Sequence, residues 1–352
     1  MTLSPSQTPA SGGRRVTLAD VARAAGTSTI TVSRALRRPE MVSEALRTRI
    51  GAVVRDLGYV PDPAARALAS QRSDVIGVLI PSVTNAVFSD VLRGIYDAVG
   101  TGPWNVQLGN TRYDPALEED LIRVFLSQRP AGLIVAGTDQ SPAARAALEA
   151  ASCPIVQIME TTADPIDMVV GFSHDAAARD ATAHLLDRGY DAPAFLCARM
   201  DPRSLRRREG FRAALAARGR APGPELTTAE PSSVGLGAEL LDRLLEAHPE
   251  ADAVFCNNDD LALGVLFAAQ RRGLAVGRDF GICGFNDLET MAAAWPRLTS
   301  MRTERREMGR IAIDRLLARI EGGEPGSAIL DLGFRLMARD STRRDGPGPA
   351  RN

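Results

Sequence analysis

A short segment near the amino terminus carries side chains of the types that contact DNA bases and phosphates. In the run STITVSR, residues 28–34, five side chains would face outward from a helix: Thr29, Ile30, Thr31, Ser33 and Arg34. A guanidinium can make paired hydrogen bonds to guanine, a methyl group can contact the thymine methyl, and hydroxyls can reach phosphates. The segment therefore predicts major-groove contacts, with Arg34 on guanine and Ile30 or Thr29 on thymine.

Two short helices around a tight turn would present these side chains. Thr17 can cap a first helix that Gly26 ends, and Ser28 can cap a second. The apolar positions with helical spacing are Val16, Leu18, Val21, Ala22, Ala24 and Ala25, followed by Val32, Ala35 and Leu36. Residues 39–58 predict a third helix, so that three helices can enclose a core. The pattern is typical of a helix-turn-helix, and a generic pair of packed helices is the alternative.

Charge and composition agree with a DNA-binding amino-terminal domain. The net charge is −1, yet residues 14–72 hold eleven Arg against five Asp and Glu, and the chain has no lysine. Phosphate contacts must therefore come from arginine, hydroxyls or the backbone. The sequence has no long apolar run, and its first thirteen residues lack the features of a signal peptide, so we expect a cytoplasmic protein. The four isolated cysteines predict buried free thiols.

Strands alternate with helices after Ser73. Runs typical of buried parallel strands occur at residues 75–80, 104–110, 132–137, 154–159 and 167–172, and again at 192–198, 251–257, 279–285 and 297–302. The two series predict two similar α/β halves. A chain of 352 residues suits such a large split domain together with a small one.

Polar side chains follow these strands, where open parallel sheets bind ligands. The candidate ligand contacts are Ser82, Asn85, Phe88, Asn110, Glu160, Asn258, Asp259 and Asn286. Taken singly, each of them is equally well explained as a helix cap or a turn residue. His174 and His184 have no Ser, Cys or metal-ligand partner at useful spacing, so both are predicted to be structural. We expect no metal and no cofactor.

Two runs in the amino-terminal part of the chain resemble those of a known family. The runs VTLADVARAAGTSTITVSRALRR and YVPDPAARALASQRSDVIGVLIP are similar to the lactose-repressor/galactose-repressor family of bacterial transcription regulators, and the similarity extends from Val16 to about Thr342. The resemblance implies a helix-turn-helix head and a hinge helix joined to a two-subdomain α/β module like a periplasmic binding protein. It also implies a homodimer on a palindromic operator, with residues 86–99 and the segment from Met291 as candidate dimer surfaces. Trp295 in that segment is equally well explained as a core residue.

The resemblance gives expected domain boundaries. They are a tail at 1–13, the DNA-binding domain at 14–60, the hinge at 61–73, the effector-binding and dimerisation domain at 74–342, and a tail at 343–352. The chain would cross between the subdomains near residues 172, 302 and 329. The first subdomain would therefore comprise about 74–172 and 302–328, and the second about 173–301 and 329–342.

The family's functional positions can be carried over residue by residue. Thr29, Ile30 and Arg34 match the base-reading positions, and those nearer the phosphates are Thr17, Ser28, Thr31 and Ser33. Leu68 matches the leucine that the family inserts into the minor groove, and Ala67 belongs to the small face on which two hinge helices pack. Arg207 matches the arginine that points into the effector cleft, where a carboxylate or a hydroxyl pair is its natural partner.

The runs LGNTRYDPALEEDLIR, ADPIDMVVGFSHDAA and RRREGFRAAL resemble the gluconate-repressor branch, which implies a sugar acid as effector. A neutral sugar or a nucleoside is the alternative ligand. Two other function classes fit less well. A sugar-binding protein of the transport type would need a secretion signal and no basic head. An α/β enzyme would need a motif such as GxxxxGK[ST] or GxSxG, and the sequence has neither.

Overall fold

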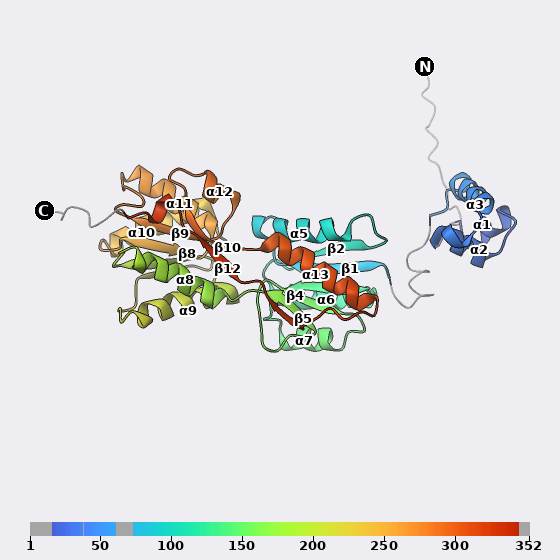
Figure 1. Cartoon of the computed structure of the whole chain (residues 1–352), viewed down its shortest axis with the longest axis horizontal. Coiled ribbons are helices and arrows are strands. Elements are labelled where there is room, and N and C mark those ends of the chain that lie inside the picture. The colour runs from blue at the N-terminus through green and yellow to red at the C-terminus, as the bar shows by residue number, and fades with distance from the viewer. Residues whose placement is uncertain (1–15, 38, 61–72, 345–352) are drawn as a thin grey trace, which may run out of the picture. The chain divides into compact units, whose positions relative to one another are not determined.

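The computed structural model describes residues 16–37, 39–60 and 73–344 (Figure 1). The chain forms two compact units, which meet in the sequence at Ser73 and Asp74. The hinge positions Ala67 and Leu68 lie outside the described residues. None of the described helices is long and apolar enough to cross a membrane.

The first unit is a bundle of short helices: α1 (Leu18–Ala24), α2 (Thr29–Arg37), the 3₁₀ turn η1 (Pro39–Met41) and α3 (Glu44–Asp56). Its buried core consists of Val21, Ala22, Ala25, Val32, Ala35 and Ile50. The helical spacing of the apolar residues predicts that Ala24 and Leu36 also face this core, and both predictions are wrong, because Ala24 is exposed and Leu36 is 39% exposed. The predicted third helix begins later, after η1, and Ser43 at its N-cap position makes no capping hydrogen bond.

The second unit contains two six-stranded sheets. The first sheet has the order β11-β5-β4-β3-β1-β2 and the second has the order β12-β10-β9-β8-β6-β7. The strands of the first sheet are β1 (Val75–Ile80), β2 (Asn105–Asn110), β3 (Gly132–Ala136), β4 (Ile155–Ile158), β5 (Met168–Gly171) and β11 (Ile329–Asp331). Those of the second are β6 (Pro193–Cys197), β7 (Glu225–Thr227), β8 (Ala253–Cys256), β9 (Gly281–Asn286), β10 (Thr299–Thr303) and β12 (Phe334–Met337). All pairings are parallel except that of β10 with β12.

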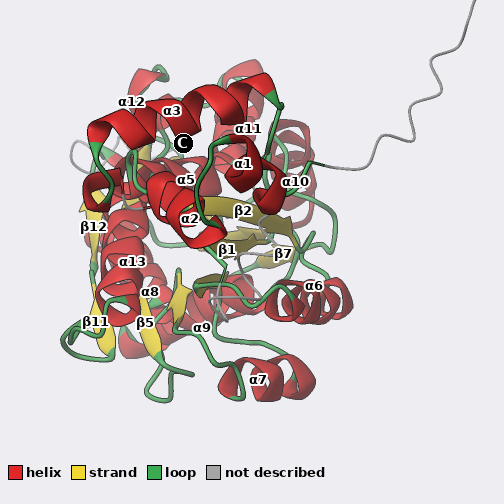
Figure 2. Cartoon of the chain, turned by 90° about the vertical axis from the view of Figure 1, so that its right-hand side faces the viewer, coloured by secondary structure: helices red, strands yellow, loops and turns green. Residues whose placement is uncertain are grey.

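Helices cover both faces of each sheet. They are α5 (Ala86–Val99), α6 (Pro115–Ser127), α7 (Pro142–Glu149), α8 (His174–Asp187), α9 (Pro202–Ala217), α10 (Val234–Ala247), α11 (Asp259–Arg271), α12 (Glu289–Ala293) and α13 (Arg305–Ile320). On the first sheet, α5 and α13 pack against one face and α6 and α7 against the other (Figure 2). On the second sheet, α8 and α9 cover one face and α10 and α11 the other. The predicted fold class is confirmed.

The chain crosses between the subdomains three times. It crosses after β5, after β10 and after β11. The third crossing lies at residues 332–333, so the expected position near 329 is a few residues too early, and residues 329–331 pair with β5 in the first sheet. Likewise residue 302 belongs to β10 in the second sheet. Each subdomain therefore contains segments that are far apart in the sequence.

Close helix packing fixes α8 against α9. Gly210 on α9 faces the backbone of α8, and a Cβ atom at this position would lie 2.2 Å from the carbonyl oxygen of Asp175. Only glycine permits this approach. This contact between α8 and α9 also sets the relative position of two residues, because α8 begins with His174 and α9 carries Arg207.

Candidate functional site

The amino-terminal unit presents the three predicted base-reading side chains on one helix. Thr29, Ile30 and Arg34 of α2 are exposed, and Ile30 is 63% exposed although it is apolar. Ser28 begins the helix, because its Oγ accepts a hydrogen bond of 3.1 Å from the backbone N–H of Thr31. An exposed isoleucine beside an arginine on a short helix is a surface suited to base edges.

Thr17 has a capping role at the start of α1. Its Oγ1 accepts from the backbone N–H of Asp20, and the Asp20 carboxylate accepts from the Thr17 backbone at 3.0 Å. This reciprocal capping box fixes the orientation of the first helix. Thr31 and Ser33 are half-buried on α2.

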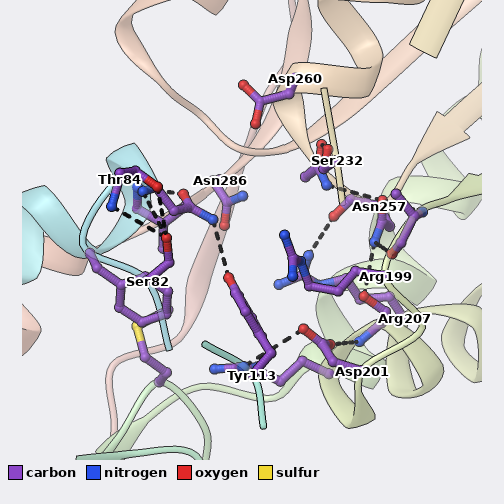
Figure 3. Close-up of a pocket in the computed structure, with 18 residues that line it drawn as sticks. Ser82, Thr84, Tyr113, Arg199, Asp201, Arg207, Ser232, Asn257, Asp260 and Asn286 are labelled. Atoms are coloured by element: carbon purple, nitrogen blue, oxygen red, sulfur yellow. Dashed lines mark hydrogen bonds and ion pairs between the residues drawn. The ribbon is translucent and has the colours of Figure 1, made fainter. Parts of the chain in front are cut away.

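A pocket of about 180 Å³ lies in the second unit, and residues from both subdomains line it (Figure 3). Six predicted ligand contacts are on its wall: Ser82, Asn85, Phe88, Arg207, Asn258 and Asn286. The wall also contains Thr84, Val87, Tyr113, Met159, Ala198, Arg199, Asp201, Arg203, Ser204, Ser232, Asn257 and Asp260. The pocket thus lies beyond the carboxyl ends of the strands, as the alternation of strands and helices predicts.

Three helix N-termini converge on this pocket. The N-cap residues Asn85 of α5, Asp201 of α9 and Asn258 of α11 all belong to the wall. Each of these side chains accepts a hydrogen bond from the first turn of its own helix. Capping and pocket lining are therefore combined in the same residues. The positive ends of three helix dipoles favour a negatively charged ligand here.

The backbone of the wall is unusual. Tyr113, Met159, Arg199 and Asn286 have positive φ angles of 60°, 78°, 66° and 111°. Non-glycine residues rarely adopt this region, and each instance costs on the order of 1 kcal/mol or more. Asn286 is also 4% exposed, and its Oδ1 has no hydrogen-bond partner among the described residues. Strained backbone and an unsatisfied amide are typical of a binding site.

Arginines dominate the part of the wall contributed by the second subdomain. Arg199 lies over the ring of Tyr113 at 4.1 Å from the centroid, and Arg203 lies over the same ring at 5.7 Å. Arg203 has a carboxylate partner in Asp201 at 3.7 Å. Tyr113 belongs to the first subdomain, so these ring contacts link the two subdomains, and its hydroxyl accepts from the Asn85 Nδ2 at 3.4 Å.

Arg207 is the most buried cation of the pocket wall, at 8% exposed, and its contacts are all neutral. Its Nε and Nη2 each lie 3.2 Å from His174 Nδ1, its Nη1 donates to the Asn257 carbonyl, and its guanidinium lies 3.8 Å from the centroid of Phe285. The pKa of Arg207 is lowered to about 10, chiefly by burial; the nearby charge of Asp201 opposes the shift and that of Arg203 adds to it. At neutral pH the group therefore remains a cation. No carboxylate of the described residues forms an ion pair with it.

The histidines make structural contacts. Burial lowers the pKa of His174 well below its ordinary value, and Arg207 adds to this effect. His184 lies 2.8 Å from the Thr342 hydroxyl, and burial lowers its pKa to about 4.

Three predicted ligand contacts are not on the pocket wall. Asn110 accepts from the backbone N–H of Arg112 at 3.3 Å and stabilises the turn after β2. Glu160 is paired with Arg206 at 2.7 Å across the two subdomains, and burial raises its pKa to about 7 although Arg206 opposes the shift.

Asp259 is the third of these residues, and it lies behind the pocket. It accepts hydrogen bonds from the Ser300 hydroxyl at 2.6 Å and from the Leu288 backbone at 2.7 Å. Its neighbour Asp260 lines the pocket instead, and burial raises its pKa. Successive residues at a helix start point in different directions, so only one of the pair can face the ligand.

Sequence reasoning also missed several wall residues. The helical spacing of Arg203 and Arg207, four residues apart on α9, was a signal that both face the same side. Tyr113 and Arg199 gave no such signal, since a positive φ at these residues would be expected only for glycine. Trp295 is 80% exposed, so the alternative that it belongs to the core is wrong.

Family models match both units of the chain. The model described as bacterial regulatory proteins, lacI family, matches residues 17–62, and that of the periplasmic binding protein-like domain matches residues 182–342. The HTH-type transcriptional regulator GntR of Pseudomonas aeruginosa is 45% identical over 93% of this chain and 96% of its own length. The GntR regulator of Escherichia coli K12 is 39% identical over 92% of this chain and 97% of its own length.

Solved structures agree with these relatives. A LacI-family regulator from Silicibacter pomeroyi has a TM-score of 0.86 at 36% identity, covering 94% of this chain and all of that one. The lac repressor dimer bound to operator and an anti-inducer has a TM-score of 0.80 at 27% identity, covering 94% of this chain and 99% of that one. With an α2 surface suited to DNA, a pocket between two α/β subdomains and relatives along nearly its whole length, the chain belongs to the LacI family of DNA-binding transcriptional regulators.

Proposed function

We propose that this regulator is a cytoplasmic repressor and that a sugar acid, with gluconate as the first candidate, controls its binding to operator DNA. The similarity to relatives named GntR supports the gluconate branch over a neutral sugar or a nucleoside. The chain then acts as a binding protein and not as an enzyme. The observation that carries the effector assignment is Arg207.

Arg207 is a buried cation that forms no ion pair with a carboxylate of the described part of the chain, although the charge of Asp201 acts on it. A buried charge is costly unless an opposite charge compensates it, and a ligand carboxylate would supply that charge. Arg199 and Arg203 lie on the same wall, and the three helix N-termini add partial positive charge. Against these stand only two carboxylates on the wall, Asp201 and Asp260. The electrostatics therefore favour an anion.

The hydrogen-bond inventory of Arg207 leaves room for a forked contact. A guanidinium has five N–H donors. One on each of Nε, Nη1 and Nη2 is directed to His174 or to the Asn257 carbonyl. Two donors remain, one on each terminal nitrogen, and both are available to the oxygens of a ligand carboxylate.

Other wall residues provide contacts for the hydroxyl groups of a sugar acid. Ser82 and Thr84 lie in the turn between β1 and α5, with their hydroxyls 3.2 Å apart. The carboxylate of Asp260 has no hydrogen-bond or ion-pair partner among the described residues and can accept from a ligand hydroxyl. A carboxylate-binding side and a hydroxyl-binding side in one pocket together match an open-chain sugar acid.

For DNA, we propose that Arg34 binds a guanine in each half-site, with Thr29 and Ile30 beside thymine methyl groups. Thr17, Ser28, Thr31 and Ser33 would lie nearer the phosphates, and Ala67 and Leu68 would act at the centre of the operator. A palindromic operator requires two such heads, and therefore a homodimer.

The proposed dimer surface lies on the second subdomain. Trp295 is 80% exposed, and Phe267 of α11 is 43% exposed. The two lie near each other, since Gln270 of α11 donates to the Trp295 carbonyl at 2.7 Å. Exposed aromatic side chains of this size are typical of an interface.

Calorimetric titration tests the effector assignment. The wild-type protein is expected to bind gluconate more tightly than glucitol, which has the same carbon chain and no carboxylate. The Arg207→Met variant should lose on the order of 1.5–3 kcal/mol of gluconate affinity, as for a hydrogen bond to a charged group. Arg212→Met is the control, because Arg212 lies on the same helix and pairs with Glu225 outside the pocket.

Two outcomes would contradict the assignment. One is a wild-type protein that binds a neutral sugar but no sugar acid at millimolar concentration. The other is an Arg207→Met variant that binds gluconate as tightly as the wild-type protein. Neither outcome affects the membership of the chain in the LacI family.

A further inference from the structure

The partner of Arg207 is a histidine, and this choice determines how much of its charge is available. Arg203, one helical turn away on α9, has the carboxylate of Asp201 beside it at 3.7 Å. Arg207 instead directs two donors to His174 Nδ1, each at 3.2 Å. His174 is 1% exposed, so solvent does not contribute to this contact.

The hydrogen bonds fix the protonation of His174. Arginine nitrogens only donate, so Nδ1 must accept and carries no proton. On the other side of the ring, Nε2 lies 3.0 Å from the carbonyl oxygen of Met159, which only accepts, so Nε2 carries the proton. Both contacts require the same tautomer, and that tautomer is uncharged. Burial and the adjacent arginines oppose protonation as well.

The ring is held in place from several sides. Phe172 contacts it edge-on with centroids 4.4 Å apart, and Phe285 lies 5.9 Å away. Phe285 also lies under the Arg207 guanidinium. His174 is the first residue of α8, directly after the first crossing, whereas Met159 follows β4 in the first subdomain. The imidazole thus orients the arginine and joins it to both subdomains.

We infer that His174 is a positioning residue that orients Arg207 without neutralising it and thereby makes the pocket selective for an anionic ligand. A carboxylate at this position would orient the guanidinium equally well, but it would supply the counter-charge that the ligand otherwise provides. This inference rests on the proposed effector site and adds the residue that sets its charge preference.

Two variants with side chains of the same shape separate the two effects of residue 174, namely the orientation of Arg207 and the charge beside it. His174→Asn places an uncharged acceptor beside Arg207, and His174→Asp places a carboxylate of the same shape there. Each variant is titrated by calorimetry with gluconate and with glucitol, and thermal unfolding is recorded to verify folding. We expect His174→Asp to weaken gluconate binding at least tenfold more than His174→Asn does, with glucitol binding equal in the two. Equal gluconate affinity in both variants would overturn the inference.

A ligand-free measurement keeps the inference testable if a variant does not fold or if the effector is not a sugar acid. In the ¹⁵N-labelled wild-type protein, NMR should report a protonated Nε2 and an unprotonated Nδ1 for His174 between pH 6 and 8. The Nδ1 resonance should shift in Arg207→Met and stay in place in Arg212→Met. A protonated Nδ1 would overturn the inference, and so would an Nδ1 resonance that does not shift in Arg207→Met. Failure of the proposed function appears separately, as a wild-type protein that binds no sugar acid.

Discussion

Replacing Gly210 by alanine should separate α9 from α8 and disturb the pocket from a distance. Gly210 is three residues after Arg207 on α9, and it faces the first turn of α8, which begins with His174. The added Cβ would lie 2.2 Å from the carbonyl oxygen of Asp175 and 2.9 Å from the Cβ of Ala178. Backbone atoms cannot rotate away, so the helices must move.

The size of the effect follows from these distances. Ordinary contact begins at 3.4 Å, so α9 must shift by about 1 Å. Overpacking of this kind lowers the free energy of unfolding by roughly 1–3 kcal/mol. The better helix propensity of alanine offsets about 1 kcal/mol of this loss. The same shift would lengthen the 3.2 Å contacts between Arg207 and His174 beyond hydrogen-bond distance. Stability and gluconate affinity should therefore fall together.

Thermal unfolding with and without gluconate measures both effects. We expect the unfolding midpoint of Gly210→Ala to fall by a few degrees, at about 2–4 °C per kcal/mol for a domain of this size. The rise of the midpoint on adding gluconate should shrink. Gly235→Ala is the matched control, because Gly235 lies near the start of α10 and its Cβ would meet only the Ser233 hydroxyl at 3.9 Å. A Gly210→Ala protein that unfolds and binds like Gly235→Ala would refute the packing argument.

Three further predictions address the head, a buried acid and the dimer surface. Arg34→Ala should cost about 1–3 kcal/mol per lost base contact and relax the preference at one operator position, and a selection from randomised operators that returns an unchanged preference would contradict it. Burial, reinforced by Asp139, raises the pKa of Glu118 to about 7, so its contribution to stability is full below pH 4.5 and is lost as the pH rises through 7. Glu118→Gln should therefore gain unfolding temperature relative to wild type between pH 5 and pH 8, and a pH-independent difference would argue against the shift. Trp295→Glu should dissociate the proposed homodimer in sedimentation, and a dimer that persists would exclude Trp295 from the interface.

The strands of the second unit were predictable because buried parallel strands have no polar face. The run VIGVLI is β1 in full, and its pairing places Val78 between Leu108 of β2 and Ile134 of β3. The short edge strands β7, β11 and β12 were missed. They have three or four residues each and are only partly buried, so no continuous apolar run marks them.

The pocket was predictable where polar residues follow strands, and it was not where the backbone itself is unusual. Ser82, Asn85 and Asn258 follow apolar runs and cap the helices or turns that come next. Tyr113 and Arg199 lie in the pocket because their backbone is left-handed, and neither residue is a glycine whose presence in the sequence would have indicated this conformation. The tertiary structure imposes this conformation against the local preference of each residue. Contacts of that kind depend on the assembled fold and cannot be deduced from local sequence.

The rings of Phe172 and Phe285 also limit how the two subdomains can move. Both are fully buried, and they belong to one apolar core that runs from the first sheet to the second without interruption. Fully exposing two such rings would cost about 3–6 kcal/mol. An effector typically shifts a conformational equilibrium by about 1–3 kcal/mol. The joint between the subdomains is therefore stiff, and a ligand in the pocket can only twist or slide one subdomain on the other by small amounts, without swinging the cleft wide open.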